Sequence, residues 1–323
     1  APLVDVNGNP LKPGQVTYTI RDFYDNTLVA EGISGESYTW QAVTDRQTFK
    51  RYKVFASTAK GMCDSYAGTP RIAAGPAFRL PVNESFADAR FMNEEFIRDN
   101  SIWAAQTPSG SHAVWQIYSD GGDVVSHDGD NAFSGSYSEY QFDEVMLYSG
   151  KIDLTGAANP TLVFHYWVFY PDCNNLIDVK VNDGSGFRTV KSLVTGGDAT
   201  GWAEVMVPLG AYAGKTVQIA FNTRTVDYSY VVVDNISVAD LKVHDLAVSG
   251  VSVPARMHAG REEVISVRVE NRGIADAEGY VVELYCNDVP VQEIAGPALA
   301  AGAGAEVRLV VTPPVTAPRT LRY

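Results

Sequence analysis

Hydrophobic and polar residues alternate with a period of two over short runs along most of the chain. The segments 15–20 (QVTYTI), 52–59 (YKVFASTA) and 264–271 (VISVRVEN) show this alternation clearly, and it is typical of half-buried strands. Turn formers such as DN, SG and NDGSG separate the runs. In the middle of the chain no segment keeps the period of a helix. The pattern therefore predicts an all-β protein, and together with the motifs described below it leads us to expect three consecutive β-sandwich modules.

One run, YVVVDNISV at residues 230–238, departs from this pattern at a single position. Its apolar and β-branched residues predict a buried strand, yet Asp234 lies in the middle of it. A carboxylate inside a buried strand is costly unless something pairs with it. Two explanations are open: Asp234 binds a cation, or it caps a turn or accepts backbone N–H hydrogen bonds at a bend in the strand.

Composition and charge limit the kinds of partner. The chain has 323 residues, a hydrophobic content of 46% and a formal net charge of −13, and its length favours two or three domains. A surface this acidic repels nucleic acid phosphates, and the sequence has no basic stripe, so we expect no nucleic acid partner. No run reaches the ~20 apolar residues of a membrane helix, so we expect no membrane insertion in this segment.

The cysteines give no sign of a disulfide framework or a zinc site. There are three, Cys63, Cys173 and Cys286, far apart and without a C-x-x-C pair. An odd number at such spacing argues against both kinds of site. We expect three reduced side chains that pack as small hydrophobic groups.

The sequence of the first 79 residues indicates an incomplete module. VTYTIRD and RYKVFASTAKG resemble the central strand and a late strand of a fibronectin type III domain. We therefore place a partial fibronectin type III-like module at residues 1–79. The opening strands of that family are missing, because residues 1–14 are few and rich in turn formers. The resemblance implies a spacer, and the module shows no binding loop.

Residues 80–240 carry the most specific set of motifs. In order they are ESF, AFSGSYS, KIDLTGAANPTLVFHYW, GWAEVMVPLGAYAGKTVQIAF and VDNISV. This series resembles the cleaved-adhesin jelly rolls of gingipains, which are themselves similar to MAM domains. The resemblance implies a jelly roll with the role of a binding unit. It also implies an exported bacterial protein, secreted or held at the cell surface.

The same resemblance implies a structural calcium site. In such jelly rolls an acidic residue of the first strand and one of the last face each other, and the matching positions are Glu84 and Asp234. The loop SHDGDNAFSG adds Asp128, Asp130 and Asn131 as further candidate ligands. Carboxylate and carbonyl oxygens are ligands that suit Ca²⁺. DGDN is also an ordinary turn sequence and lacks the EF-hand spacing, so the two explanations for Asp234 stay open.

Residues 241–323 predict a third sandwich. HDLAVSGVSVP and VRVENRGIADAEGYVVELYCND resemble a CARDB module, which implies an immunoglobulin-like fold. The chain stops at PRTLRY, where the family would begin another strand. We therefore expect a truncated module in which residues 313–323 lack partners and are poorly ordered.

Motifs for catalysis are missing from the sequence. There is no G-x-S-x-G elbow, no phosphate-binding loop and no zinc-binding histidine pattern. His127 and the adjacent Asp128 are residue types found in a catalytic triad, but no nucleophile motif accompanies them. His165 is interpreted as an ordinary strand residue. We therefore expect no enzyme activity from this chain. The histidines are His112, His127, His165, His244 and His258.

Aromatic residues are the remaining signal of function. Sugar-binding sandwiches stack aromatic rings on sugar faces, and loops carry function on such scaffolds. Four rings lie in or near the polar loops and are candidate ligand-binding residues: Trp103, Trp115, Tyr118 and Tyr137. The alternative is that these rings pack in the core, as we expect for Trp202 in its GW motif.

Together these observations predict a non-catalytic adhesion or ligand-binding segment of an exported bacterial surface protein. The jelly roll would bind a carbohydrate or an extracellular host protein, and we expect a monomer. The alternative is that the modules are spacers that present or target an enzyme domain absent from this chain. Since one sandwich fold supports many roles, the fold alone does not choose between these two functions, and both interpretations depend on the family resemblances.

Overall fold

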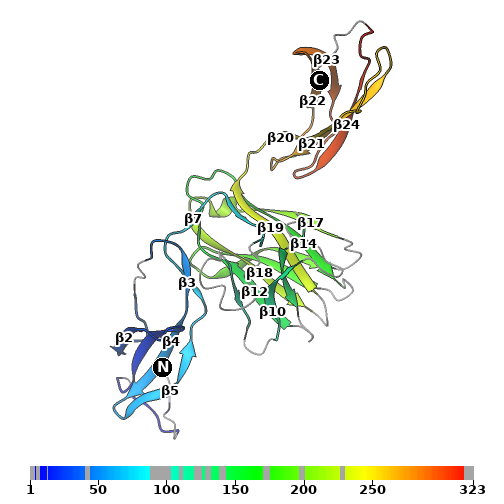
Figure 1. Ribbon diagram of the computed structural model, residues 1–323. Helices are drawn as coiled ribbons and strands as arrows, with labels where there is room; N and C mark the ends of the chain where they lie inside the picture. Colours follow the sequence, from blue (N-terminus) through cyan, green and yellow to red (C-terminus); the bar gives the residue numbers. More distant parts are fainter. Residues whose placement is uncertain are drawn as a thin grey trace. The chain divides into compact units, whose positions relative to one another are not determined.

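The computed structural model describes residues 4, 8–12, 14–40, 44–87, 103–108, 112–119, 126–127, 132–137, 143–169, 175–195, 201–225 and 230–315. The chain forms two compact units. The first consists of residues Ala1–Gly156, Leu162–Val207 and Tyr212–Val238, and the second of Ala157–Thr161, Pro208–Ala211 and Ala239–Tyr323. Strands make up the described elements, together with one 3-10 turn, η3 (Gly210–Tyr212) (Figure 1). The all-β prediction is confirmed.

The first unit begins with a four-stranded antiparallel sheet in the order β2-β1-β4-β5. Its strands are β1 (Thr17–Asp22), β2 (Leu28–Ile33), β4 (Tyr52–Thr58) and β5 (Gly61–Gly68). A separate ribbon pairs β3 (Thr48–Lys50) with β6 (Ile72–Ala74). Among the described residues before Thr17 there is only one isolated bridge, Val4 with Pro10. The likeness of this module to fibronectin type III stays a prediction.

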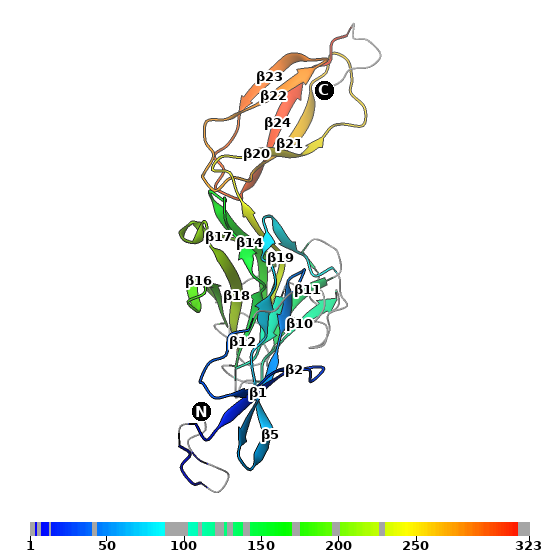
Figure 2. The same ribbon diagram turned by 90° about the vertical axis from the view of Figure 1, so that its left-hand side faces the viewer.

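The rest of the first unit is a sandwich of two sheets (Figure 2). The first sheet has the order β10-β11-β19-β14-β17, and a short strand β8 also pairs with β19. We call this sheet A. Its strands are β8 (Val82–Glu84), β10 (Val114–Ser119), β11 (Ala132–Tyr137), β14 (Pro160–Phe169), β17 (Ala203–Pro208) and β19 (Tyr230–Asp240).

The opposite sheet, sheet B, has the order β16-β15-β18-β12-β9. Two short strands extend it, since β13 pairs with β18 and also, in parallel, with β7. Its strands are β7 (Phe78–Arg79), β9 (Trp103–Gln106), β12 (Asp143–Ser149), β13 (Ile152–Asp153), β15 (Asn175–Asn182), β16 (Phe187–Thr195) and β18 (Thr216–Thr225).

The core of the sandwich lies between these two sheets. Phe164 of sheet A meets Phe221 of sheet B edge to face, with ring centroids 4.8 Å apart, and both side chains are fully buried. Along β14 the residues Leu162, Phe164 and Val168 are buried, whereas His165 and Trp167 are only partly buried. This difference follows from the period of two, which sends alternate side chains to opposite faces of the sheet.

Sheet B is covered on its outer face by the N-terminal ribbon. Phe49 of β3 packs edge to face on Tyr148 of β12, at a centroid distance of 5.7 Å, in a cluster with Ala104 and Ala220. The Tyr148 hydroxyl donates a hydrogen bond of 2.8 Å to the carbonyl of Arg71. Burial raises the pKa of Tyr148 to about 12. One outer face of the sandwich is therefore largely used for packing within the unit.

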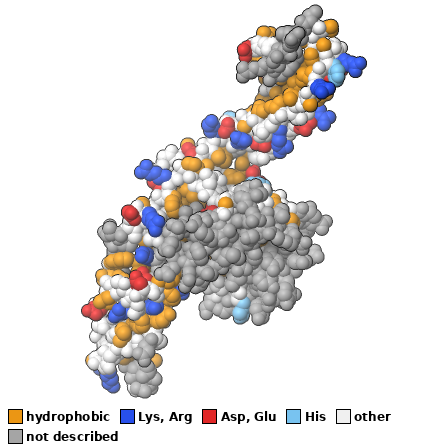
Figure 3. Space-filling view, viewed as in Figure 1, with side chains coloured by type: hydrophobic (Ala, Val, Ile, Leu, Met, Phe, Trp, Pro, Cys, Tyr) orange, Lys and Arg blue, Asp and Glu red, His pale blue; other side chains and the backbone are white. Residues whose placement is uncertain are grey.

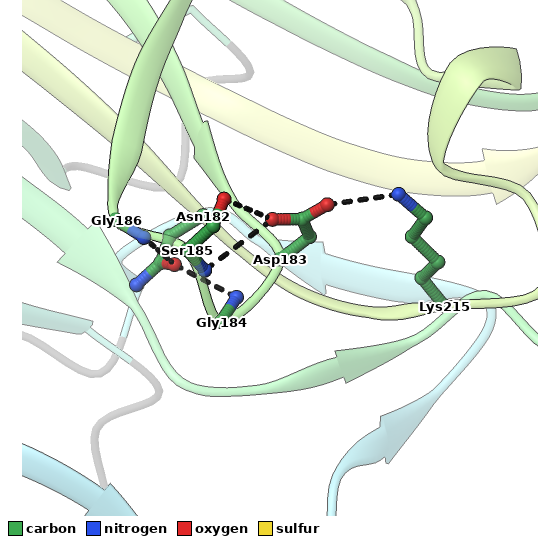
Figure 4. A network of polar contacts seen from close by, with 6 residues as sticks. All are labelled: Asn182, Asp183, Gly184, Ser185, Gly186 and Lys215. Atoms are coloured by element: carbon green, nitrogen blue, oxygen red, sulfur yellow. Dashed lines mark hydrogen bonds and ion pairs between the residues drawn. The ribbon is translucent and has the colours of Figure 1, made fainter.

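The turn between β15 and β16 is the hairpin that the sequence NDGSG predicts. Asn182 Oδ1 accepts the N–H groups of Gly184 and Gly186 at 2.9 and 3.0 Å. Asp183 accepts the Ser185 hydroxyl at 2.7 Å and the Lys215 ammonium at 2.8 Å (Figure 4). These two donors, Lys215 first, hold the pKa of the Asp183 carboxyl well below its usual range.

The second unit is a smaller sandwich. A sheet in the order β20-β21-β24 faces the hairpin of β22 and β23. Alternation along β21 buries Ile265, Val267 and Val269, as the sequence predicted. The strands are β20 (Leu246–Ser252), β21 (Glu263–Asn271), β22 (Val281–Cys286), β23 (Val289–Ala295) and β24 (Gly304–Val311). Residues 316–323 lie outside the described part, so the expectation for the end of the chain stays a prediction.

A single buried amide organises the turns of this second unit. Asn271 is 1% exposed, and its Nδ2 donates to the carbonyls of Ala275, Leu299 and Ala300 at 2.8, 3.1 and 3.2 Å. Its Oδ1 accepts the N–H of Gly273 at 3.1 Å. Because a buried amide is costly unless its hydrogen bonds are made, these contacts specify the path of two loops at once.

The cysteines fit the sequence interpretation in part. Cys63 and Cys286 are free thiols, and both are only partly buried. Cys173 lies outside the described residues.

We predict that replacing Lys215 by Met raises the pKa of Asp183 toward the usual value of about 3.9. A carboxyl whose pKa is lowered by folding stabilises the folded state above its unfolded pKa, and this contribution is lost as the pH falls through the folded pKa. The Lys215→Met variant therefore loses the contribution at a higher pH than the parent chain. NMR titration of the Asp183 side chain measures the shift. Arg188→Met, which removes an exposed cation from β16, is the control, and an equal shift there contradicts the prediction.

Candidate ligand-binding face

Asp234 lies in β19 with an exposed fraction of 0%. Its Oδ2 accepts the backbone N–H of His127 and its Oδ1 accepts the N–H of Asn235, both at 2.8 Å. Asn235 has a φ of 47°, so the strand bends directly after the carboxylate. Asp234 therefore accepts backbone N–H hydrogen bonds at a bend in the strand, which is the second of the two explanations that the sequence left open.

Two of the candidate calcium ligands, Glu84 and Asp234, lie on neighbouring strands. Glu84 of β8 pairs with Ile236 of β19, two residues after Asp234 in the same strand. Glu84 Oε1 accepts the N–H of Phe86 at 2.8 Å. Asp128, Asp130 and Asn131 lie outside the described residues. Within the described part of the chain, no group of three or more His, Cys, Asp or Glu side chains has metal-binding geometry.

The hydrogen bond from His127 to Asp234 fixes the position of a ring. The His127 imidazole stacks on that of His165 in β14, with centroids 3.6 Å apart and planes 20° apart. His127 Nδ1 also lies 3.0 Å from Nδ2 of Asn235. Because an amide nitrogen only donates, Nδ1 is the acceptor in this contact. Asp234 and Asn235 therefore hold His127 by its backbone and by its ring.

Two tryptophans and a carboxylate complete this group. Trp202 lies edge to face with His127 at a centroid distance of 6.0 Å, and with Trp167 of β14 at the same distance. Glu204 Oε2 lies 3.6 Å from His165 Nε2. We call this group the outer-face cluster; its members are His127, His165, Trp167, Trp202, Glu204 and Asn235.

The cluster lies on the face of sheet A that points away from the core. In β17 the residues Val205 and Val207 are buried, whereas Glu204 is exposed. His165 and Trp167 lie on the corresponding face of β14, because the core takes Phe164 and Val168. The face thus offers aromatic rings beside a carboxylate, an amide and imidazole nitrogens. This combination suits a ligand that has both apolar C–H surfaces and hydroxyl groups.

The tryptophans that the sequence selected lie elsewhere. Trp103 and Trp115 are in β9 and β10 and are 3% and 8% exposed. Trp103 packs against Phe221 at a centroid distance of 5.9 Å. These two rings therefore show the packing that the sequence left open as the alternative, because the neighbouring residues form strands that turn the rings inward. The side chains of Tyr118 and Tyr137 lie outside the described residues.

Sequence reasoning did not assemble the outer-face cluster. It treated His165 as an ordinary strand residue and Trp202 as a core residue, although Trp202 is only partly buried. One signal was present: His165 and Trp167 are two residues apart in a predicted strand, so they share a face. The position of His127 on that face had no local signal.

Comparisons with known proteins agree with the motifs at the C-terminal end. Residues 238–323 match the sequence model of the CARDB family. No curated protein matches the chain. Among the described residues, no helix has the length and apolar character needed to cross a membrane.

The chain also resembles solved β-sandwich structures. One is the K2 cleaved adhesin domain of Lys-gingipain, at 20% identity over 49% of this chain and 99% of that chain, with a TM-score of 0.39. Another is the K1 cleaved adhesin domain of Lys-gingipain from Porphyromonas gingivalis W83, at 16% identity over 49% of this chain and 96% of that chain, with a TM-score of 0.38. A third is TmCBM61 in complex with beta-1,4-galactotriose, at 13% identity over 48% of this chain and 94% of that chain, with a TM-score of 0.37.

We predict that Asp234→Ala destabilises the sandwich and releases His127. Two N–H groups, both in partly buried hydrogen bonds, lose their acceptor, which costs about 1–3 kcal/mol of unfolding free energy. Denaturant unfolding measures this loss, and NMR ring-current shifts of the two imidazoles report the loss of stacking. The control is Asp178→Ala, which removes a carboxylate that accepts an exposed Ser192 hydroxyl and costs less than about 1 kcal/mol. Retained stacking in Asp234→Ala contradicts the prediction.

Proposed function

We propose that this chain is a non-catalytic carbohydrate-binding segment, and that its central sandwich binds a neutral glycan through the outer-face cluster. The observation that carries the proposal is the cluster itself. Two indole rings and two imidazoles gather on one face of sheet A, next to the exposed Glu204 carboxylate. Aromatic rings pack on the C–H faces of sugars, and the polar groups beside them select hydroxyls.

The charge of the site favours a neutral sugar. Glu204 contributes a carboxylate, and the whole chain has a net charge of −13, so an anionic ligand would be repelled at this face. A neutral sugar avoids this repulsion and donates its hydroxyl protons to the carboxylate. Hydrogen bonds to a charged acceptor of this kind are stronger than those between neutral groups.

The environments of the carboxylates favour binding without hydrolysis. Glycoside hydrolysis uses a pair of carboxyl groups on either side of the scissile bond, about 5–10 Å apart. Glu204 is the carboxylate of the outer-face cluster and is exposed, whereas the neighbouring Asp234 is wholly buried and accepts two backbone N–H groups. This arrangement supports a role in attachment. We place the chain in an exported bacterial surface protein, acting as a monomer, with the CARDB-like sandwich as a spacer.

The test is a binding screen of the full chain against neutral oligosaccharides such as galactotriose and mannohexaose. We expect Trp167→Ala and Trp202→Ala each to weaken binding about five- to thirtyfold, because stacking of a ring on a sugar contributes roughly 1–2 kcal/mol. Calorimetry gives the dissociation constants.

The matched control is Trp40→Ala, which removes an exposed indole from the N-terminal sheet and is expected to leave neutral-sugar binding unchanged. A folded chain that binds none of the oligosaccharides, or one that loses affinity equally in all three variants, rules out the outer-face cluster as a glycan site.

We further propose that Glu84 and Asp234 hold a structural Ca²⁺, assisted by Asp128, Asp130 or Asn131. The residue types and their strands support a fit to this ion. The candidate donors are all oxygen atoms, Glu84 and Asp234 come from the paired strands β8 and β19, and a buried carboxylate such as Asp234 is favoured by a nearby cation. The bound ion would stabilise the end of the sandwich where the strand bends.

The calcium proposal predicts that excess EDTA lowers the melting temperature of the chain and that added Ca²⁺ restores it. A ligand that binds only the folded state stabilises that state by mass action. Glu84→Gln should have a lower melting temperature in Ca²⁺ and should respond less to EDTA. Glu144→Gln, at an exposed ion pair with Arg224, is the control. Equal melting curves in Ca²⁺ and EDTA exclude a structural ion.

A further inference from the structure

A cavity of about 750 Å³ lies on the N-terminal sheet, away from the outer-face cluster. Its floor is the apolar face of the sheet, with Ile20 of β1, Val29 of β2 and Val54 of β4, and its wall includes the end of the ribbon at Ile72–Ala74. The described residues supply no second sheet over this face. The volume falls in the range of ligand-binding pockets, which is about 300–1,000 Å³.

Aromatic rings line this cavity and remain accessible to solvent. Trp40 lies edge to face with Tyr52 at a centroid distance of 5.5 Å, and both line the cavity together with Tyr38. Trp40 is 44% and Tyr38 46% exposed. Figure 3 shows hydrophobic side chains gathered over this N-terminal part of the surface. Large rings left this exposed beside an apolar sheet face are typical of a binding surface.

The charge of the cavity is opposite to that of the chain. Its 15 lining residues include Lys50 and Lys151 and no Asp or Glu, although the chain has 38 acidic and only 25 basic residues. Lys151 Nζ donates one hydrogen bond to the carbonyl of Gly75, which fixes the ammonium group and leaves two of its three protons for a ligand. Two cations without a lining carboxylate attract an anion.

A hydroxyl in the wall lacks a hydrogen bond. Thr44 Oγ1 is buried and has no partner among the described residues, and Thr44 is one of the lining residues. Buried hydroxyls in native proteins are normally paired, so such a group calls for a partner that the chain does not itself provide. A polar ligand in the cavity would supply one.

We propose that this cavity binds an acidic sugar, the carboxylate-bearing residue of a polysaccharide. The carboxylate pairs with Lys50 and Lys151, the C–H face of the ring packs on Trp40, and a ring hydroxyl bonds with Thr44 Oγ1. The proposal does not depend on the outer-face cluster, because the two sites share no residue and have opposite charge.

The experiment is calorimetric titration of the full chain with trigalacturonic acid and with its methyl ester, which keeps the rings and removes the charges. We expect the acid to bind, and we expect the dissociation constant of the ester to be at least about tenfold higher than that of the acid. Lys50→Ser, Trp40→Ala and Thr44→Val should each weaken binding of the acid. Lys60→Ser removes the same charge from an exposed turn of the same sheet and should have no effect. Circular dichroism confirms that each variant is folded.

Several results would overturn the proposal. Equal affinity for the acid and the ester would show that the carboxylate is not recognised. An equal loss in Lys50→Ser and Lys60→Ser would show attraction to overall charge rather than a site. If the acid does not bind and Trp40→Ala instead abolishes self-association in sedimentation, the cavity is a contact between copies of the chain. Trp202→Ala should leave acid binding unchanged, which separates this test from that of the outer-face cluster.

Discussion

The burial of one carboxylate determines how the central sandwich is built around its candidate site. Asp234 is fully enclosed in β19, where an ionised group is tolerated only with hydrogen-bond donors on its oxygens. The donors are the backbone N–H groups of His127 and Asn235. One of them comes from a segment more than a hundred residues earlier, so the same contact that makes the carboxylate acceptable also docks that segment on sheet A.

The two outer faces of the sandwich then serve different purposes. On sheet B, Phe49 and Ala73 of the N-terminal ribbon pack against Tyr148, and the face becomes an internal contact of the first unit. On sheet A, the corresponding face carries His165, Trp167 and Glu204 together with the docked ring of His127. Aromatic residues thus stabilise the fold on one side and form a candidate recognition surface on the other.

The two proposed sites differ in the kind of sugar they would accept. The outer-face cluster contains a carboxylate, whereas the cavity on the N-terminal sheet contains two lysines and no acidic residue. In a chain with net charge −13, a local positive region needs a specific arrangement of residues, since the average surface is negative. Polysaccharides with both neutral and acidic residues would present ligands for each.

The sequence by itself determined the all-β class, the strand alternation that buries Ile265, Val267 and Val269, and the hairpin at Asn182–Gly186. These features are local, because a period of two and a turn motif act between neighbouring residues. Tertiary structure alone decided that Trp103 is in the core and that His127 meets His165. Alternation states which side chains share a face, but only the packing of a second sheet decides which face is buried. Contacts between distant segments leave no local pattern to read.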